Sequence, residues 1–182
     1  MNKIYFILSL FILLSCQNEY TPKPNAFSRI DLPKKEFITS DLECPFEFKL
    51  PNYFSIQNTS EFCWKDLYFE KFDATIYMSY KEINNNLNIY IEESRDLAYK
   101  HSRVAEAIKE QEFINDSLDV FGLVYTFEGA TASGVQFYLT DSTNHFVRGA
   151  LYFNTAQNDS IVPINNFITQ DVYSIVESWN WK

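Results

Sequence analysis

The stretch that decides the fold runs from residue 133 to residue 153 and reads Ser133-Gly134-Val135-Gln136-Phe137-Tyr138-Leu139-Thr140-Asp141-Ser142-Thr143-Asn144-His145-Phe146-Val147-Arg148-Gly149-Ala150-Leu151-Tyr152-Phe153. Apolar and polar residues alternate on both sides of the quartet 142–145, which is rich in residues that form turns. Two alternating runs joined by a short turn predict a β-hairpin, with strands from Ser133 to Asp141 and from Phe146 to Phe153.

The alternation assigns the two faces of this hairpin. The core face carries Val135, Phe137, Leu139, Val147, Leu151 and Phe153. Gly149 falls on the same face, which predicts the close approach of another element. The other face carries Gln136, Tyr138, Thr140, Phe146, Arg148, Ala150 and Tyr152, where Arg148 is placed to stack on Tyr138 or to pair with a carboxylate.

Further strands are predicted on both sides of the hairpin sequence, over Cys44–Leu50, Trp64–Phe69, Ala74–Tyr80, Glu112–Asn115 and Val120–Phe127. Between the third and fourth of these, apolar residues at helical spacing predict one long helix from about Leu87 to Glu110, capped by one of Asn84, Asn85 or Asn86. His101 lies on the apolar stripe of this helix, where a structural histidine is a better interpretation than a ligand. A second helix is predicted from Pro163 to about Ser178, since proline favours the first turn.

This order of elements predicts an α+β domain, in which a mainly antiparallel sheet is packed by the long central helix and the C-terminal helix. A sandwich resembling the PsbP/Mog1 fold is the specific architecture that we expect. There is no internal repeat.

The first residues have the features of a bacterial lipoprotein signal. Lys3 precedes an apolar run from Ile4 to Leu14, too short to cross a bilayer as a helix, and Ser15 stands directly before Cys16. We expect residues 1–15 to be removed and Cys16 to carry acyl chains that hold the protein on the membrane. The alternative, an ordinary signal peptide with an incidental cysteine, is weakened because no small-x-small cleavage site lies nearby.

Composition limits what the mature chain can do. The net charge is −9, with 24 acidic and 15 basic residues and no basic stripe, which argues against nucleic-acid binding and against electrostatic docking on anionic lipid. Residues 16–42 are polar and marked by prolines, and are expected to form a lipidated, extended tether, followed by a single domain over 43–182. Two cysteines remain, Cys44 and Cys63; outside the cytoplasmic membrane a disulfide is favoured over two buried thiols.

Candidates for catalysis are few. Asp141, Ser142 and His145 invite a hydrolase interpretation, but members of a triad rarely come from one tight turn, so these residues are better read as turn formers. A Gly-x-Ser-x-Gly motif, a cluster of metal-ligating residues and a phosphate-binding glycine loop are all missing from the sequence. We therefore expect no enzymatic activity and no cofactor.

The chain resembles the family of the gliding motility lipoprotein GldD. The blocks that carry the resemblance include Tyr20-Thr21-Pro22-Lys23-Pro24, Arg29-Ile30-Asp31-Leu32-Pro33, Cys44-Pro45, Cys63-Trp64, Tyr99-Lys100-His101, Leu139-Thr140-Asp141-Ser142-Thr143, His145-Phe146 and Arg148-Gly149-Ala150-Leu151-Tyr152-Phe153. Residues 25–28, Asn-Ala-Phe-Ser, depart from the arginine, glycine and aromatics that the family tends to carry there.

The resemblance implies a lipoprotein of the cell envelope that is required for gliding motility and for the associated type IX secretion system, without a cofactor or a small-molecule substrate. It implies Cys16 as the lipidated residue and other envelope proteins of this machinery as partners. The shared motifs single out Arg29, Asp31, Asp141, His145, Arg148 and Tyr152 as candidate interaction or structural residues. We expect the protein to face the periplasm; the sequence does not distinguish the inner from the outer membrane.

Two other functions stay open at this point. One is a lipoprotein that binds a small ligand or glycan in an aromatic-lined cleft, because aromatic residues make up 18% of the chain. The other is a hydrolase that uses His145.

Overall fold

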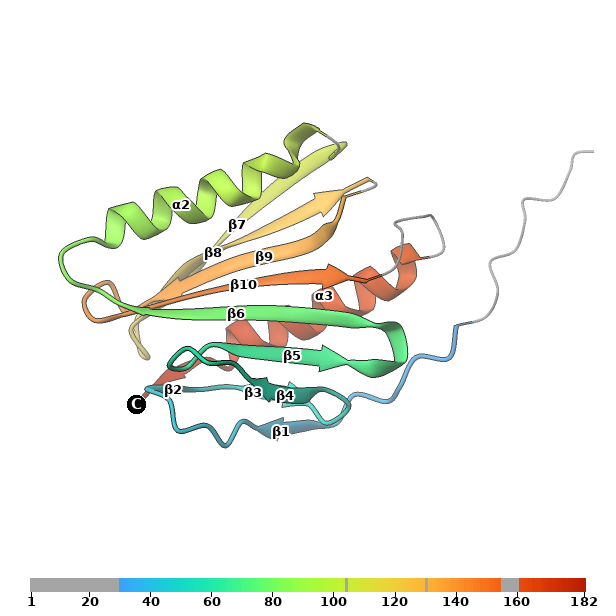
Figure 1. The fold of residues 1–182 in the computed structure, drawn as a ribbon, viewed down its shortest axis with the longest axis horizontal. Helices are drawn as coiled ribbons and strands as arrows, with labels where there is room; N and C mark the ends of the chain where they lie inside the picture. The colour runs from blue at the N-terminus through green and yellow to red at the C-terminus, as the bar shows by residue number, and fades with distance from the viewer. Residues whose placement is uncertain (1–29, 104, 130, 155–160) are drawn as a thin grey trace, which may run out of the picture. The chain divides into compact units, whose positions relative to one another are not determined.

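The computed structural model describes residues 30–182 except residues 104, 130 and 155–160 (Figure 1). The chain divides into two units, Met1–Ile30 and Asp31–Lys182, and the second of these is described below. The predicted signal peptide, Cys16, Arg29 and the first part of the predicted tether lie outside the described residues. None of the helices in the described part is long and apolar enough to cross a membrane.

An antiparallel sheet of seven strands forms the centre of the folded unit (Figure 1). Its strands are, in spatial order, β4 (Ser55–Asn58), β5 (Lys65–Phe69), β6 (Ala74–Glu82), β10 (His145–Phe153), β9 (Ser133–Thr140), β8 (Val120–Glu128) and β7 (Ala107–Asn115). Together with two long helices, this sheet confirms the α+β prediction. The more specific PsbP/Mog1-like sandwich stays a prediction.

The hairpin predicted from the decisive stretch is present. Strands β9 and β10 pair antiparallel, with Phe146 opposite Thr140 and Gly149 opposite Phe137. The six residues predicted for its core face are all buried in the main hydrophobic core. A Cβ atom on Gly149 would lie 2.3 Å from ring carbons of Phe137, so the close approach predicted at this glycine is made by a ring of the neighbouring strand.

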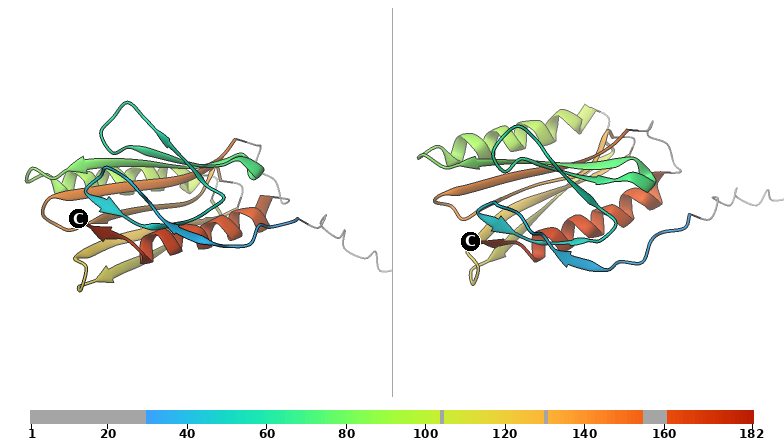
Figure 2. Two further views of the ribbon diagram at one scale, coloured as in Figure 1. Left: turned by 90° about the horizontal axis from the view of Figure 1, so that it is seen from below. Right: turned by 60° about the horizontal axis from the view of Figure 1, so that its bottom comes forward.

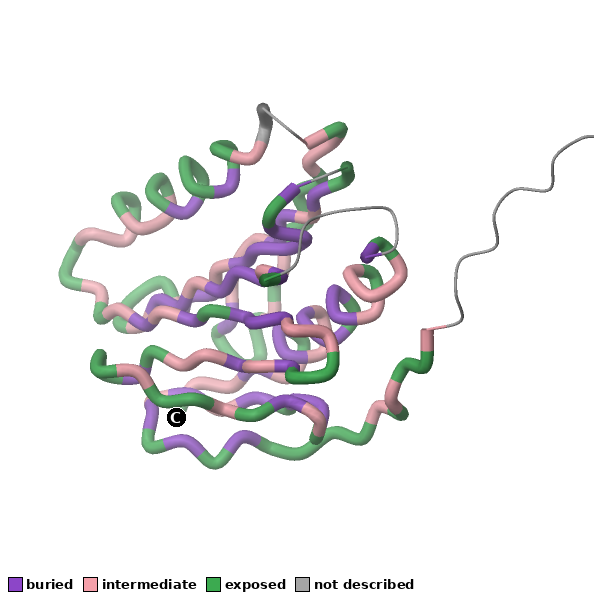
Figure 3. Tube along the Cα trace, turned by 45° about the vertical axis from the view of Figure 1, so that its right-hand side comes forward, coloured by how far each residue is buried: buried purple, intermediate pink, exposed green. Residues whose placement is uncertain are grey.

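The sheet separates two helices (Figure 2). On the core face lies α3 (Val162–Glu177), which buries Ile168, Val172, Ile175 and Val176 and has Pro163 in its first turn, as expected. On the opposite face lies α2 (Leu87–Tyr99), of which only the small residues Ser94 and Ala98 are buried. Figure 3 shows how burial is concentrated in the central strands and along one side of α3.

The prediction of one helix from Leu87 to Glu110 is wrong at its C-terminal end. The α-helix ends at Tyr99, a 3₁₀ turn η2 (Lys100–Arg103) follows, and the chain then enters β7. Strand β7 pairs with β8 at nine positions, from Ala107 opposite Glu128 to Asn115 opposite Val120, so pairing overrides the helical preference of Glu106, Lys109 and Glu110. Because β7 is an edge strand, its exposed charges protect the open side of the sheet.

Asn86 is the N-cap residue of α2, as predicted for one of the three asparagines. Its side-chain oxygen, however, accepts from the backbone N–H of Asn84 at 2.8 Å and makes no capping bond to the helix.

Two small sheets lie outside the main one. The alternating run Cys44–Leu50 forms the short strands β2 (Phe46–Glu47) and β3 (Lys49–Pro51), which pair with β11 (Asn180–Trp181) and β1 (Phe37–Thr39) respectively. Since β1 is part of the folded unit, the compact structure begins at Asp31, ahead of the boundary at residue 43 that the sequence suggested.

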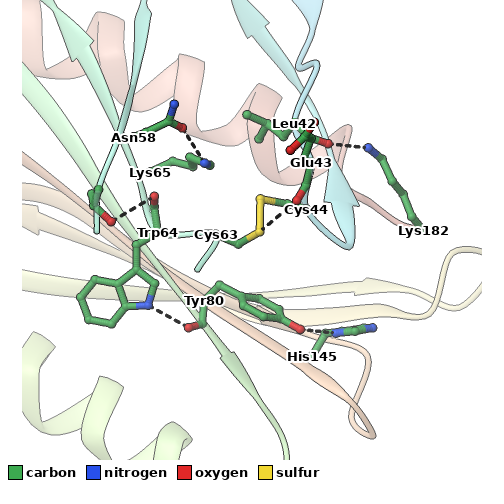
Figure 4. Close-up of a disulfide and its surroundings, with 11 residues drawn as sticks. Leu42, Glu43, Cys44, Asn58, Cys63, Trp64, Lys65, Tyr80, His145 and Lys182 are labelled. Atoms are coloured by element: carbon green, nitrogen blue, oxygen red, sulfur yellow. Dashed lines mark hydrogen bonds between the residues drawn. A yellow bond between two sulfur atoms is a disulfide. The ribbon is translucent and has the colours of Figure 1, made fainter. Parts of the chain in front are cut away.

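Cys44 and Cys63 form a disulfide with a Cα–Cα distance of 5.6 Å, as predicted (Figure 4). Replacing both cysteines by serine should lower the free energy of unfolding by about 3 kcal/mol, because the bond closes a loop between residues 19 apart and thereby restricts the unfolded chain. Urea unfolding of the oxidised wild type and of the double variant measures this difference. Wild type unfolded under reducing conditions is the matched control, and equal midpoints for oxidised and reduced protein would contradict the prediction.

Candidate functional site

The turn between β9 and β10 is organised by one carboxylate. Oδ1 of Asp141 accepts the backbone N–H groups of Thr143, Asn144 and His145 at 3.0, 2.8 and 2.8 Å, and Ser142 adopts φ of 67°. Burial raises the pKa of Asp141, but these N–H donors outweigh burial and the pKa lies below its ordinary value. The turn-forming role that the sequence indicated is therefore the role that the geometry shows.

His145 points to the core side of the sheet at the same end. Its Nδ1 lies 2.8 Å from the hydroxyl of Tyr80 (Figure 4). Its ring stacks on Trp181 at a centroid distance of 5.4 Å. Asp141 accepts the backbone N–H of His145 and makes no described contact to its ring. The arrangement is that of a structural histidine and does not support the hydrolase interpretation.

Arg148 and Tyr152 lie on the opposite face of β10, so the predicted motif residues divide between two faces. Nη2 of Arg148 donates to Oε1 of Gln136 at 2.6 Å. Burial lowers the pKa of the Arg148 guanidinium, and its hydrogen bond to Tyr152 opposes that shift. Within the described residues Arg148 forms no ion pair with a carboxylate and no stack on Tyr138; its neutral partners replace both expected contacts.

Asp31 lies at the other end of the sheet. Its backbone oxygen accepts from Nζ of Lys71, in the 3₁₀ turn η1 (Glu70–Phe72) that precedes β6. The register of β6 and β10 places Phe153 opposite Ala74 at this end and His145 opposite Glu82 at the other, about 25 Å away along the strands. The structure thus does not bring Asp31 together with Asp141 and His145.

A pocket of about 450 Å³ lies between α2 and the face of the sheet that carries Arg148. Four aromatic residues contribute to its lining, Trp64, Tyr77, Tyr90 and Phe146. Its charged residues are Asp66, Lys81, Glu93 and Arg148.

Local contacts fix two walls of this pocket. Nε1 of Trp64 donates to the backbone oxygen of Tyr80 at 2.9 Å, which orients the indole beside β6. Lys81 forms an ion pair with Glu93 of α2 at 3.0 Å and lies 4.4 Å from the ring centroid of Tyr90. These contacts join β6 to α2 at the edge of the pocket. The described residues contain no group of three or more histidine, cysteine or acidic side chains placed to hold a metal ion.

A comparison with protein families identifies the chain. The model of the gliding motility lipoprotein GldD matches residues 17–181, nearly the whole mature sequence. The chain belongs to the GldD family. It is therefore a gliding-motility-associated lipoprotein of the cell envelope, in a family that is not known for catalysis. Among curated proteins, none matches the chain in sequence.

For this member of the GldD family, sequence reasoning placed Arg148 on the correct face but did not single out Trp64, Asp66 and Tyr77. One signal was available for Tyr77. The alternation in β6 puts it between Thr75 and Ser79 on the face away from the core, where its ring stays 44% exposed although it meets Tyr152 at a centroid distance of 6.0 Å. Trp64, Asp66 and Tyr90 come from other elements, and only the fold brings them beside it.

Proposed function

We propose that this GldD-family lipoprotein is required for gliding motility and for the associated type IX secretion system, and that it acts through protein–protein contacts that assemble or stabilise the machinery. The observation that carries the proposal is the family match over residues 17–181, which leaves outside the predicted signal peptide, Cys16 and Lys182. In this proposal the acyl chains on Cys16 hold the protein on the membrane, and the folded unit faces the periplasm.

Features of the folded unit support a contact role. Its described surface exposes large apolar side chains, among them Phe62 at 65%, Ile114 at 63% and Ile89 at 57%. Exposed apolar side chains of this size are a common element of protein interfaces. The acidic net charge of −9 favours partners with basic surfaces.

The proposal predicts that a strain lacking the gene loses colony spreading and secretion of type IX cargo, and that a plasmid copy restores both. A copy with Cys16→Ala should fail to restore them, because the protein cannot be acylated, and it should not incorporate labelled palmitate. Plate spreading, immunoblots of culture medium and palmitate labelling are the measurements.

A copy with Cys44→Ser and Cys63→Ser is the matched control for loss of cysteine, since it removes these two cysteines and their disulfide without removing the anchor. Immunoblots confirm that each variant accumulates. Normal spreading in the deletion strain would contradict the motility role, and normal secretion with lost spreading would contradict the link to type IX secretion.

A further inference from the structure

The pocket between α2 and the sheet has the size of a small-molecule site. At about 450 Å³ it lies within the range in which proteins bury a ligand of a few rings. Strands β5, β6 and β10 provide its floor, and α2 contributes Tyr90, Ser94 and Leu97 to one wall. The loose packing of α2, with only Ser94 and Ala98 buried, leaves this space open.

Arg148 is a positive charge in the pocket, and none of the carboxylates in the described part of the chain forms an ion pair with it. The other cation there, Lys81, is already paired with Glu93. The described partners of Arg148 are the amide oxygen of Gln136 and the hydroxyl of Tyr152, both neutral, although a guanidinium has five N–H donors. A partly buried charge is stable when an opposite charge meets it, so this site favours an anionic ligand group.

The hydrogen bond to Gln136 fixes the position of the Arg148 guanidinium. The side chain of Gln136 is 1% exposed, and while Oε1 accepts from Arg148, Nε2 has no hydrogen-bond partner among the described residues. A buried amide donor without a partner lowers the stability of the folded state. This unpaired donor belongs to a side chain that orients the guanidinium of Arg148.

The other lining groups select among anions. Trp64 is 37% exposed and Tyr77 is 44% exposed, so both rings offer flat apolar surface beside the cation. Ala150 lies opposite Tyr77 in the register of β6 and β10. Asp66, opposite Tyr77 on the other side, carries a carboxylate without a described partner, which accepts hydroxyl groups and repels a second negative charge.

We propose that this pocket binds a carboxylate-bearing sugar: the carboxylate pairs with the guanidinium of Arg148, the apolar face of the ring lies against Trp64 and Tyr77, and hydroxyl groups donate to Asp66. The carboxylate of Asp66 disfavours polyphosphates and other anions with several negative charges. This binding role is separate from the proposed motility role and does not depend on it.

The test is calorimetric titration of the mature lipoprotein in detergent with two sugars. N-acetylmuramic acid carries a lactyl carboxylate, and N-acetylglucosamine is the same ring without it. We expect saturable one-to-one binding of the acid and at least ten-fold weaker binding of the neutral sugar, since a hydrogen bond to a charged group contributes about 1.5–3 kcal/mol. Glucuronic acid as a second probe should also bind more tightly than glucose.

Variants assign the effect to the pocket. Arg148→Gln should reduce the affinity for the acid to that for the neutral sugar, and Arg148→Lys should give an intermediate value because it keeps the charge but not the planar fork. Tyr77→Ala should lower the affinity for the acid and for the neutral sugar by the same factor. Lys109→Gln on the edge strand β7 is the control and should leave binding unchanged.

Three outcomes would overturn the proposal. The first is the absence of binding for both sugar acids, and the second is an unchanged affinity in Arg148→Gln that folds as the wild type does by circular dichroism. The third is Arg148-dependent binding of D-alanyl-D-alanine with no binding of either sugar acid, which would assign the site to a peptide carboxylate.

Discussion

Replacing Trp179 by alanine is expected to lower the free energy of unfolding by roughly 3–5 kcal/mol, because the indole is 0% exposed and belongs to the main hydrophobic core. Its ring stacks on Phe48 at a centroid distance of 5.1 Å and on Phe46 at 4.7 Å, and meets Trp181 edge-on at 5.5 Å. Such ring pairs add stability beyond the area that they bury. Urea unfolding followed by far-UV circular dichroism measures the loss.

Two further variants test whether the loss comes from burial of the ring. Trp179→Phe keeps an aromatic ring between Phe46 and Phe48 and should cost clearly less than the alanine variant. Phe62→Ala removes a ring that is 65% exposed and should change the free energy of unfolding by less than about 1 kcal/mol. A loss below about 1 kcal/mol in Trp179→Ala would show that the cluster is not packed as described.

The stacked rings of Trp179, Phe46, Phe48 and Trp181 explain how the small sheet of β2 and β11 persists beside the large one. Strands β2 and β11 have two residues each, and so short a pair is not stable by itself. Trp179 follows α3 directly and Phe46 lies in β2, so the stacked rings attach the C-terminal strand and the segment after Cys44 to the helix. The disulfide from Cys44 then joins the same segment to the chain just before β5.

The fold was predictable where one local pattern is decisive. In β9 and β10 the alternation, the turn quartet and Gly149 all agree, and the hairpin is present with the expected faces. Ile108 shows the limit, since one apolar residue in a run of Lys and Glu fits a helix and an edge strand equally well. Likewise, the period of two in Cys44–Leu50 predicts which residues are buried but contains no information on which strand pairs with them.

The candidate site was predictable only in part, because local patterns do not determine which strands and helices become neighbours. Side-chain alternation placed Arg148 and Tyr152 on the face away from the core, and the structure agrees. The pocket itself depends on Trp64 before β5, Tyr77 in β6 and Tyr90 in α2, which come together through sheet order and helix placement. Neither property follows from local spacing, because the chain between these residues does not determine which strands become neighbours.

The second large effect is expected at Lys35. This residue belongs to the predicted tether and lies near the start of the folded unit Asp31–Lys182. Its Nζ lies 2.6 Å from Oδ1 of Asp171 on α3, a side chain that is 0% exposed, and the hydroxyl of Tyr53 donates to Oδ2 at 2.6 Å. Lys35→Met keeps the apolar stem but leaves the Asp171 carboxylate buried without its cation. Breaking a buried pair in this way costs about 3–5 kcal/mol, which urea unfolding at pH 7 should show.

A matched control lies one residue away. Lys34 pairs with Glu36 at 3.1 Å, but their side chains are 86% and 57% exposed, so Lys34→Met should cost less than about 1 kcal/mol. The double variant Lys35→Met with Asp171→Leu removes both charges and should recover much of the loss. Equal destabilisation by Lys34→Met and Lys35→Met would contradict the role assigned to burial.

The pH dependence supplies an independent check on the same pair. Burial raises the pKa of Asp171 above its ordinary value, and Lys35 and Tyr53 oppose this shift. A raised pKa in the folded state means that protonation favours folding: this contribution is complete below the carboxyl's ordinary pKa and is lost as the pH rises through the raised value. Removing Lys35 removes an opposing group and raises the pKa further, so the destabilisation of Lys35→Met relative to wild type should be largest at neutral pH and should shrink on acidification. A difference that stays constant between pH 7 and pH 4 would contradict the assignment of the loss to the charge of Asp171.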